Sequence, residues 1–290
     1  MTTRVMINKE IVDFAQFICN LLGYDKYLPA NGGAEACETA VKVARRWGYA
    51  VKGVEHDKAS VIMANRNFWG RSITASGACD DPSRYRAFGP FTPGFPLVDF
   101  DDLEALETAI VAEPNTVAVF LEPVQGEGGI NVPSAGYMKK VKDLCEKHNV
   151  LLVADEVQTG FGRTGKLMGN YHDFDGTGTK PDILVLAKSI SGGFLPSSGI
   201  VCDDHIMLNI KIGEHGSTFG GNPMAMGVAK RAVEVLLEEK MTENSAAMGD
   251  YLLPKLQAID SPIIKGARGR GLFNAIELHE GLAVNNFDLT

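Results

Sequence analysis

The sequence has no long apolar run and no excess of positive charge. No hydrophobic stretch reaches the length that crosses a bilayer. The first residues, MTTRVMINKE, lack the apolar core of a secretory signal and do not make a convincing transit peptide. The formal net charge of −8 disfavours binding to nucleic acid or to an anionic membrane surface. We therefore expect neither a nucleic acid nor a membrane among its partners.

Paired cysteines and metal-binding histidines are also missing. The cysteines are odd in number, widely scattered and without a CxxC pair: Cys19, Cys37, Cys79, Cys145 and Cys202. This pattern favours free thiols in a reducing compartment. The six histidines show no metal-ligand spacing, so no metal site is expected.

What is present is ordinary globular composition with alternating strand and helix patterns. The chain is 45% hydrophobic and 22% charged, and its 290 residues can fill more than one domain. Apolar runs predict strands at 59–64, 116–121, 151–154, 183–187, 198–202 and within 263–278. Helical spacing predicts helices at 7–22, 34–51, 103–111, 135–148, 223–240 and 242–259, whereas 79–100 is expected to be a long loop. The alternation from 59 to 188 predicts an α/β fold with parallel βαβ units.

The stretch LLVADEVQTGFGRTGK, residues 151–166, is the centre of this pattern. Its apolar run ends on Asp155 and Glu156, and the next buried run, 183–187, ends on Lys188. Carboxyl ends of parallel strands meet at one edge of an open sheet, which is the usual place for an active site. We therefore expect a carboxylate and a lysine to lie together there.

Two phosphate-binding patterns overlap in the same stretch. Gly160, Gly162 and Gly165 spell GxGxxG, and with Lys166 they spell GxxxxGK. In a Rossmann site the glycines follow the strand directly and open a helix, but five residues intervene here and no helical pattern follows. A P-loop needs Ser or Thr after its lysine, where this chain has Leu167. We interpret both matches as accidental.

The lysine and the carboxylate suggest cofactor chemistry. Burial of an amine at a strand end lowers its pKa and makes it nucleophilic toward a carbonyl. A carboxylate nearby can keep a pyridinium nitrogen protonated, as pyridoxal phosphate enzymes require. The alternatives are that Lys188 is a surface residue at the end of its strand and that Asp155 caps a turn.

Three flanking segments have two interpretations each. The turn NGG before the helix pattern at 34–51 can bind phosphate through free backbone N–H groups, or it is a plain helix start. The aromatic pair Phe68–Trp69 can stack on a flat ligand or pack at the rim of the sheet. The glycine-rich stretch 213–223 suggests a close approach of backbone to another group.

The ordered motifs resemble the class III, fold-type I pyridoxal phosphate aminotransferases. They are GAEA, NFWGRS, EPVQGEGG, DEVQTGFGRTGK, LAKSISGG and GEHGSTFGGNP, over about residues 5–278. Within this class, LGYDKYLPANGGAEACETAVKVARRWGY and FGPFTPGF are most similar to the ornithine aminotransferases. The resemblance implies an α/β large domain with a mainly parallel sheet between helices, residues 1–235, and the start of a small C-terminal α+β domain, 236–290.

The resemblance also implies how pyridoxal 5'-phosphate is held. Lys188 would bind the cofactor covalently and move the proton between substrate and cofactor carbons. Asp155 would pair with the pyridine nitrogen, Gln158 would hydrogen-bond the ring hydroxyl, and Phe68 would stack on the ring.

The phosphate contacts imply a homodimer with shared active sites. Gly33 and Ala34 would offer backbone N–H groups to the phosphate, whereas Ser217 and Thr218 would reach the phosphate held by the partner subunit.

The implied reaction transfers the δ-amino group of L-ornithine to 2-oxoglutarate, which gives glutamate 5-semialdehyde and glutamate. Arg71 would bind a substrate carboxylate, and Glu122 and Glu127 would line the site, with Glu127 as a gate on the substrate side. The alternatives are another class III ω-aminotransferase, such as one acting on acetylornithine, and a non-catalytic subunit.

Chains of this family are longer at both ends. We therefore expect a chain truncated at both ends, with an intact cofactor set, an incomplete substrate set and possible loss of activity. The expected location is the cytoplasm, or the mitochondrial matrix if a targeting segment was lost with the N-terminus.

Overall fold

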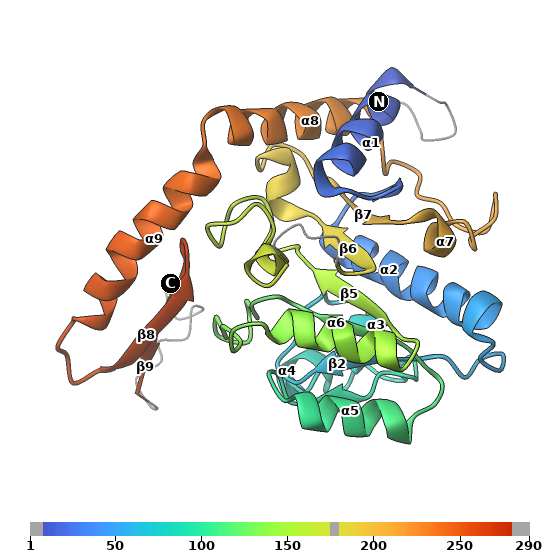
Figure 1. Cartoon of the computed structure of the whole chain (residues 1–290), viewed down its shortest axis with the longest axis horizontal. Helices are drawn as coiled ribbons and strands as arrows, with labels where there is room; N and C mark the ends of the chain where they lie inside the picture. The colour runs from blue at the N-terminus through green and yellow to red at the C-terminus, as the bar shows by residue number, and fades with distance from the viewer. Residues whose placement is uncertain (1–7, 175–179, 280–290) are drawn as a thin grey trace.

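A mostly parallel sheet lies at the centre of the computed structural model, which describes residues 8–174 and 180–279 (Figure 1). Seven strands of this described chain form the sheet in the order β1-β7-β6-β5-β4-β2-β3. The strand β7 is antiparallel to both of its neighbours, and the other neighbouring pairs are parallel. The strands are β1 (Lys26–Ala30), β2 (Ser60–Ala64), β3 (Leu97–Val98), β4 (Thr116–Leu121), β5 (Leu151–Asp155), β6 (Ile183–Leu186) and β7 (Ser198–Cys202).

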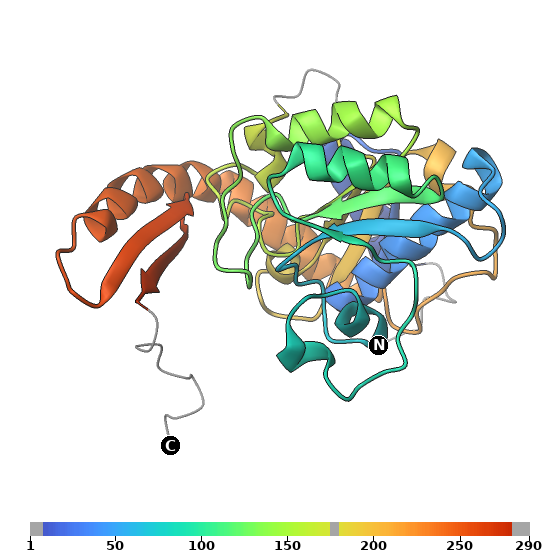
Figure 2. The same ribbon diagram turned by 90° about the horizontal axis from the view of Figure 1, so that it is seen from below.

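Helices cover both faces of the sheet (Figure 2). One face packs against apolar side chains of α1, α5, α6 and α8, and the other packs against α2 and α7. The α-helices are α1 (Lys9–Leu22), α2 (Gly33–Trp47), α3 (Ile73–Gly77), α4 (Pro82–Tyr85), α5 (Leu103–Ala112), α6 (Tyr137–Lys147), α7 (Asp204–Met207), α8 (Pro223–Glu238) and α9 (Met241–Gln257). Shorter helices are a π-helix, η1 (Gly48–Lys52), and the 3-10 helices η2 (Gly169–His172) and η3 (Lys188–Ser191).

A smaller unit projects from the end of α8 (Figures 1 and 2). It consists of α9 and an antiparallel hairpin of β8 (Ile264–Arg270) and β9 (Phe273–Leu278). Lys240, with φ at 52°, separates α8 from α9. The division of the chain at residue 235 stays a prediction, and residues 280–290 of that expected second domain lie outside the described residues.

The glycines of the two apparent phosphate motifs allow this unit to pack closely. A β-carbon on Gly162 would lie 3.0 Å from the hydroxyl of Thr242 on α9, and one on Gly165 would lie 3.0 Å from the Cα of Ala246. In the hairpin turn, a β-carbon on Gly271 would overlap the backbone of Thr164. Contact with the small unit therefore explains Gly162 and Gly165, whereas Gly160 is packed against Glu156 and Met168.

The expected α/β architecture is confirmed, with two local differences. The strand β1 was missed, because Pro29 and the following glycines read as a chain break. Proline has no N–H to donate, but an edge strand tolerates it, and β1 lies at the edge of the sheet. The segment 79–100, expected to be a loop, contains α4 and the two-residue strand β3. All five cysteines are buried free thiols. None of the helices in the described residues has the length and apolar character needed to cross a membrane.

The contact at Gly271 gives a test of how the small unit is attached. Its φ of +58° and the overlap at the β-carbon mean that Gly271→Ala must displace the hairpin. We expect this substitution to lower the free energy of unfolding of the docked small unit by about 2–3 kcal/mol, through crowding and backbone strain. Amide hydrogen exchange in β8 and β9 should accelerate accordingly. Gly266→Ala in the same hairpin is the matched control, because nothing lies within 4 Å of its β-carbon position. Equal exchange in the two variants would contradict this account of the docking.

Candidate active site

Three segments far apart in the sequence meet at the carboxyl ends of β5 and β6. The β-carbon position of Gly33 lies 3.2 Å from Cγ1 of Val157 and 3.5 Å from Cβ of Ala187. The N-terminus of α2 therefore packs against both the turn after β5 and the residue that precedes Lys188. The structure thus brings together the helix start, the acidic strand end and the lysine that the sequence singled out.

The acidic pair after β5 divides into two roles. Glu156 is fully buried and accepts hydrogen bonds from the backbone N–H groups of Gly169 and Asn170, at 2.8 and 2.7 Å, and from the Thr159 hydroxyl, at 2.5 Å. It therefore fixes the turn at η2. Asp155 is 2% exposed and accepts at Oδ1 from the Val157 N–H, at 3.0 Å. Asp155 alone of the pair is available to the site.

Burial raises the pKa values of two carboxyl groups here. The pKa of Asp155 rises to about 7, because removal from water penalises its charged form. The pKa of Glu122 rises to about 8 for the same reason, and the charge on Asp155 raises it further. Backbone N–H groups of Gly126 and Phe68 donate to Glu122, at 3.1 and 3.3 Å, and oppose this rise. The site therefore holds carboxyl groups that a nearby cation would stabilise.

Lys188 supplies a cation at the carboxyl end of the neighbouring strand β6. It starts η3 directly after β6, with φ at 44° in the left-handed region that non-glycine residues seldom adopt. Burial lowers the pKa of its amine below the ordinary 10.5, while Asp155, Glu127 and Glu122 oppose the change through their charges. A lower pKa leaves more of the amine neutral and nucleophilic at a given pH.

Gln158 carries an unsatisfied polar atom in the site. Its Nε2 is buried and has no hydrogen-bond partner among the described residues. A β-carbon on Gly126 would overlap that nitrogen, so the glycine leaves room for the amide. Buried donors normally have partners, and this orphan marks a position where a bound group can accept.

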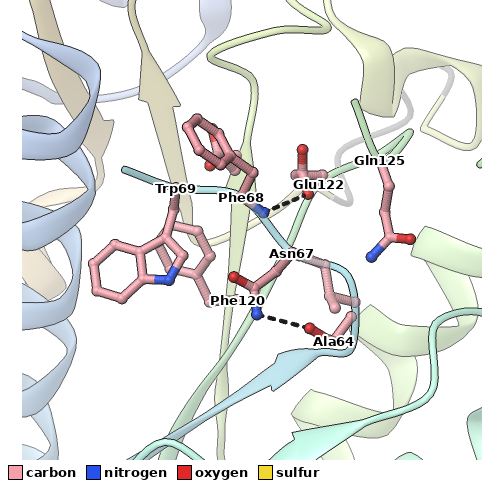
Figure 3. Close-up of a pocket in the computed structure, with 9 residues that line it drawn as sticks. Ala64, Asn67, Phe68, Trp69, Phe120, Glu122 and Gln125 are labelled. Atoms are coloured by element: carbon pink, nitrogen blue, oxygen red, sulfur yellow. Dashed lines mark hydrogen bonds between the residues drawn. The ribbon is translucent and has the colours of Figure 1, made fainter. Parts of the chain in front are cut away.

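Phe68 lies beside Glu122 in a small cavity (Figure 3), and Asp155 also lines this cavity. The guanidinium carbon of Arg84 lies 4.9 Å from the ring centroid, and that of Arg71 lies 5.9 Å from it. Trp69, the other member of the aromatic pair, instead packs against Phe95 and Phe120 in the core. The sequence offered stacking on a ligand or packing at the rim of the sheet; Trp69 instead packs in the core, and Phe68 is the member of the pair that is less buried.

The N-terminus of α2 has the features of an anion site. Its N-cap, Gly32, has no side chain to satisfy the first N–H groups. Such groups and the helix dipole attract phosphate. Asn31, one residue earlier, donates from Nδ2 to the Ser217 hydroxyl at 2.9 Å, so the loop 213–223 of the same chain lies beside this turn.

A cleft of about 1490 Å³ opens between the body and the small unit. Lys188 and Gln158 line it on the side of the body, and Leu272 and Phe273 line it on the side of the hairpin. Of the other residues singled out for this region, Arg71, Glu127 and Thr218 are exposed. Glu127 lies near enough to Lys188 for its charge to raise the pKa of the amine.

Comparison with known proteins decides the family. The model of the class-III aminotransferases matches residues 1–289. This chain belongs to the class-III aminotransferase family. A probable mitochondrial ornithine aminotransferase of Caenorhabditis elegans is 51% identical over 280 residues, which are 97% of this chain and 65% of the relative. The chain thus spans slightly less than two thirds of that relative's length.

Solved structures agree with this assignment. An ornithine aminotransferase of Toxoplasma gondii superimposes with a TM-score of 0.92 at 46% identity, over 96% of this chain and 66% of that one. An acetylornithine aminotransferase of Elizabethkingia anophelis gives a TM-score of 0.84 at 40% identity, over 97% and 66%. Another structure of the T. gondii enzyme is described as having pyridoxal phosphate at partial occupancy in its active site.

Class-III aminotransferases use pyridoxal phosphate, and the residues of this site fit that group. The fit rests on two observations. The Nε2 of Gln158 is a buried donor without a partner among the described residues and could donate to a ring hydroxyl oxygen, and the buried Asp155 carboxyl has only uncharged donors among these residues, so it could pair with a protonated ring nitrogen. The uncapped start of α2 suits the phosphate. The individual roles assigned to these side chains stay predictions.

Sequence reasoning missed one close neighbour of the site. Cys37, on α2, donates from its thiol to Oδ2 of Asp155 with a sulfur–oxygen distance of 3.6 Å. The only available signal was its spacing of four residues from Gly33, which places both on one helix face. Such spacing is common in any buried helix and did not distinguish it.

The raised pKa of Asp155 predicts a pH-dependent stability. The folded-state value of about 7 exceeds the ordinary 3.8, so the folded protein binds more protons between these values. The stability of the cofactor-free protein should therefore fall as the pH rises from about 4 through 7. The asparagine in Asp155→Asn cannot ionise, so this variant should lose less stability over the same range. Its free energy of unfolding, relative to that of the wild type, should rise by on the order of 2 kcal/mol from pH 5 to pH 8.

Urea unfolding at the two pH values measures this difference. Asp143→Asn is the control, because that carboxylate on α6 is 57% exposed and its loss should change stability little. An advantage of Asp155→Asn that is the same at pH 5 and pH 8 would show that Asp155 does not titrate in this window.

Proposed function

We propose that this protein catalyses the pyridoxal phosphate-dependent transfer of the δ-amino group of L-ornithine to 2-oxoglutarate. The products are glutamate 5-semialdehyde and glutamate, which links the protein to arginine and proline metabolism. The observation that carries the proposal is the meeting of Lys188, Asp155 and the uncapped start of α2 at the carboxyl ends of β5 and β6, beside the cleft that Lys188 lines. The choice of ornithine as the substrate is supported by the similarity to ornithine aminotransferases over nearly the whole chain.

The cofactor supplies an electron sink that makes the carbon bearing the substrate's amino group acidic. Lys188 Nζ would take the proton from that carbon and pass it to the cofactor carbon, and burial, which lowers the pKa of the amine, favours the neutral form that accepts a proton. Asp155 keeps the ring nitrogen protonated, Gln158 donates to the ring hydroxyl, and Phe68 supports the face of the ring. Gly33 and Ala34 hold the phosphate through their N–H groups.

The substrate side uses charged residues at the mouth of the cleft. Arg71 is exposed close to Phe68 and binds a carboxylate of the substrate. Glu127 is exposed near Lys188 and serves as the gate that distinguishes the cationic donor from the dianionic acceptor. Glu122, buried beside Asp155, lines the floor of the site.

We also propose a homodimer with shared sites. Ser217 and Thr218 lie on the loop beside the start of α2, and Thr218 is exposed. The family resemblance implies that Ser217 and Thr218 reach the phosphate bound by the partner subunit, although the contact of Ser217 with Asn31 places this loop beside the start of α2 in its own chain. The cytoplasmic location stays a prediction, since several relatives are named as mitochondrial and others carry no compartment in their names.

A second candidate substrate is acetylornithine, because the E. anophelis structure at 40% identity is an acetylornithine aminotransferase. That donor has an acetylated α-amino group and therefore lacks the charge that ornithine carries there. Glu127 would attract the α-ammonium of ornithine and gain nothing from the acetylated form. This difference favours ornithine.

Visible absorption spectra of the purified protein with pyridoxal phosphate test the cofactor site. We expect an absorption band in the wild type that borohydride fixes covalently to the protein, and no such band for Lys188→Ala. The amine is the nucleophile that the bond requires. Lys166→Ala, a lysine of the glycine-rich turn, is the control and should keep the band. Absence of the band in folded wild-type protein would defeat the enzyme proposal and leave a non-catalytic subunit as the better account.

Addition of each amino donor then tests the substrate. Ornithine should bleach the band, with kcat/KM at least roughly ten-fold above that for acetylornithine, since one lost charge contact of about 1.4 kcal/mol corresponds to that factor. Glu127→Gln removes the charge that attracts the α-ammonium group, so it should lower the ratio of kcat/KM for ornithine to kcat/KM for acetylornithine. A higher kcat/KM with acetylornithine than with ornithine would contradict the proposal and identify acetylornithine as the preferred amino donor.

A further inference from the structure

Cys37 occupies a position on α2 that links the two ends of the candidate cofactor site. It is 1% exposed and lies one helical turn after Gly33, on the same face of α2. Gly33 packs against the turn after β5, and Cys37 packs one turn deeper against Asp155 itself. A single rigid helix therefore contacts both the phosphate end and the carboxylate end.

The two oxygens of Asp155 are held by different parts of the chain. Oδ1 accepts from the Val157 N–H, which belongs to the local turn, at 3.0 Å. Oδ2 accepts from the Cys37 thiol across the helix–strand interface, at 3.6 Å. The terminal torsion of an aspartate is broad, so one contact alone leaves the carboxylate plane free to rotate. The second contact fixes the plane.

A thiol has the donor properties that this position requires. Burial raises the pKa of Cys37 well above its ordinary value, so the sulfur stays protonated and can donate. The thiol is also a weak, uncharged donor, and a carboxylate has further lone pairs to offer. It orients Asp155 without competing strongly for the charge that a protonated ring nitrogen would pair with.

We propose that Cys37 is a positioning residue whose thiol holds the Asp155 carboxylate in the orientation that receives the protonated ring nitrogen of the cofactor. This inference rests on the proposed function for its purpose. The contact between Cys37 and Asp155 can nevertheless be tested without any cofactor.

The first experiment follows the protonation of Asp155 in the cofactor-free protein. Infrared titration detects the protonated carboxyl group, and the Asp155 signal is assigned by its loss in Asp155→Asn. Because the thiol stabilises the charged form, Cys37→Ala should raise the titration midpoint by roughly 0.5–1 pH unit. Cys145→Ala is the matched control, since it removes an equally buried thiol from α6 and should leave the midpoint unchanged.

Two further variants separate the hydrogen bond from packing. Cys37→Val removes the donor while filling the space, and it should raise the midpoint as Cys37→Ala does, which keeps the test open if the alanine variant fails to fold. Cys37→Ser restores a donor and should bring the midpoint back toward the wild type. Unchanged midpoints in Cys37→Val and Cys37→Ala, or a serine variant that shifts as far as they do, would overturn the proposal.

The second experiment measures affinity for pyridoxal phosphate. Cys37→Ala should bind the cofactor roughly three- to ten-fold more weakly than Cys145→Ala, as a midpoint shift of this size implies. Equal affinities beside a clear titration shift would mean that the thiol tunes Asp155 without positioning it for the cofactor, and would overturn the proposal. If the wild type itself binds no cofactor, the proposed function fails, and the infrared titration still reports whether Cys37 holds Asp155.

Discussion

The constraint on which the site depends is the burial of a carboxyl group at the carboxyl end of β5. Asp155 is removed from water, and its described hydrogen-bond donors are the uncharged groups of Val157 and Cys37. A carboxylate in such surroundings is costly to ionise, which raises its pKa to about 7. The charge of Lys188 opposes this rise in pKa, and a further cation bound beside Asp155 would stabilise its charged form more.

The helix α2 organises the rest of the site around that carboxyl group. Its first turn packs on Val157 and Ala187, so the strand end that carries Asp155 and the one that carries Lys188 are held against one surface. Gly70 approaches the same helix, because its β-carbon position lies 2.6 Å from the Cβ of Ala34, and this contact brings the segment of Phe68 alongside. The start of α2 therefore fixes the two strand ends and the segment of Phe68 relative to one another, which suits chemistry that needs fixed geometry.

Much of the fold follows from periodicity, because the buried strands β4, β5, β6 and β7 are continuous apolar runs bounded by polar residues. Their ends correctly located the lysine and the aspartate. The edge strand β1 was not predicted, because proline at position 29 is typical of a turn. The pairing of β1 with β7, which the local sequence does not show, makes this segment a strand. The distinction between Asp155 and Glu156 was equally out of reach, since it depends on where the turn at η2 places its N–H groups. Cys37 could not be found for a related reason: a contact across a helix–strand interface leaves no local pattern.

The two edges of the central sheet have a consequence for how copies of this chain can meet. At one edge β1 includes Pro29, which offers no N–H, and at the other β3 is only two residues long. Neither edge presents a long row of free backbone groups, so the sheet is a poor template for adding strands from another molecule. Growth by adding strands to this seven-stranded sheet is thereby disfavoured, which leaves the hairpin of β8 and β9 as the part of the described chain with longer free strand edges.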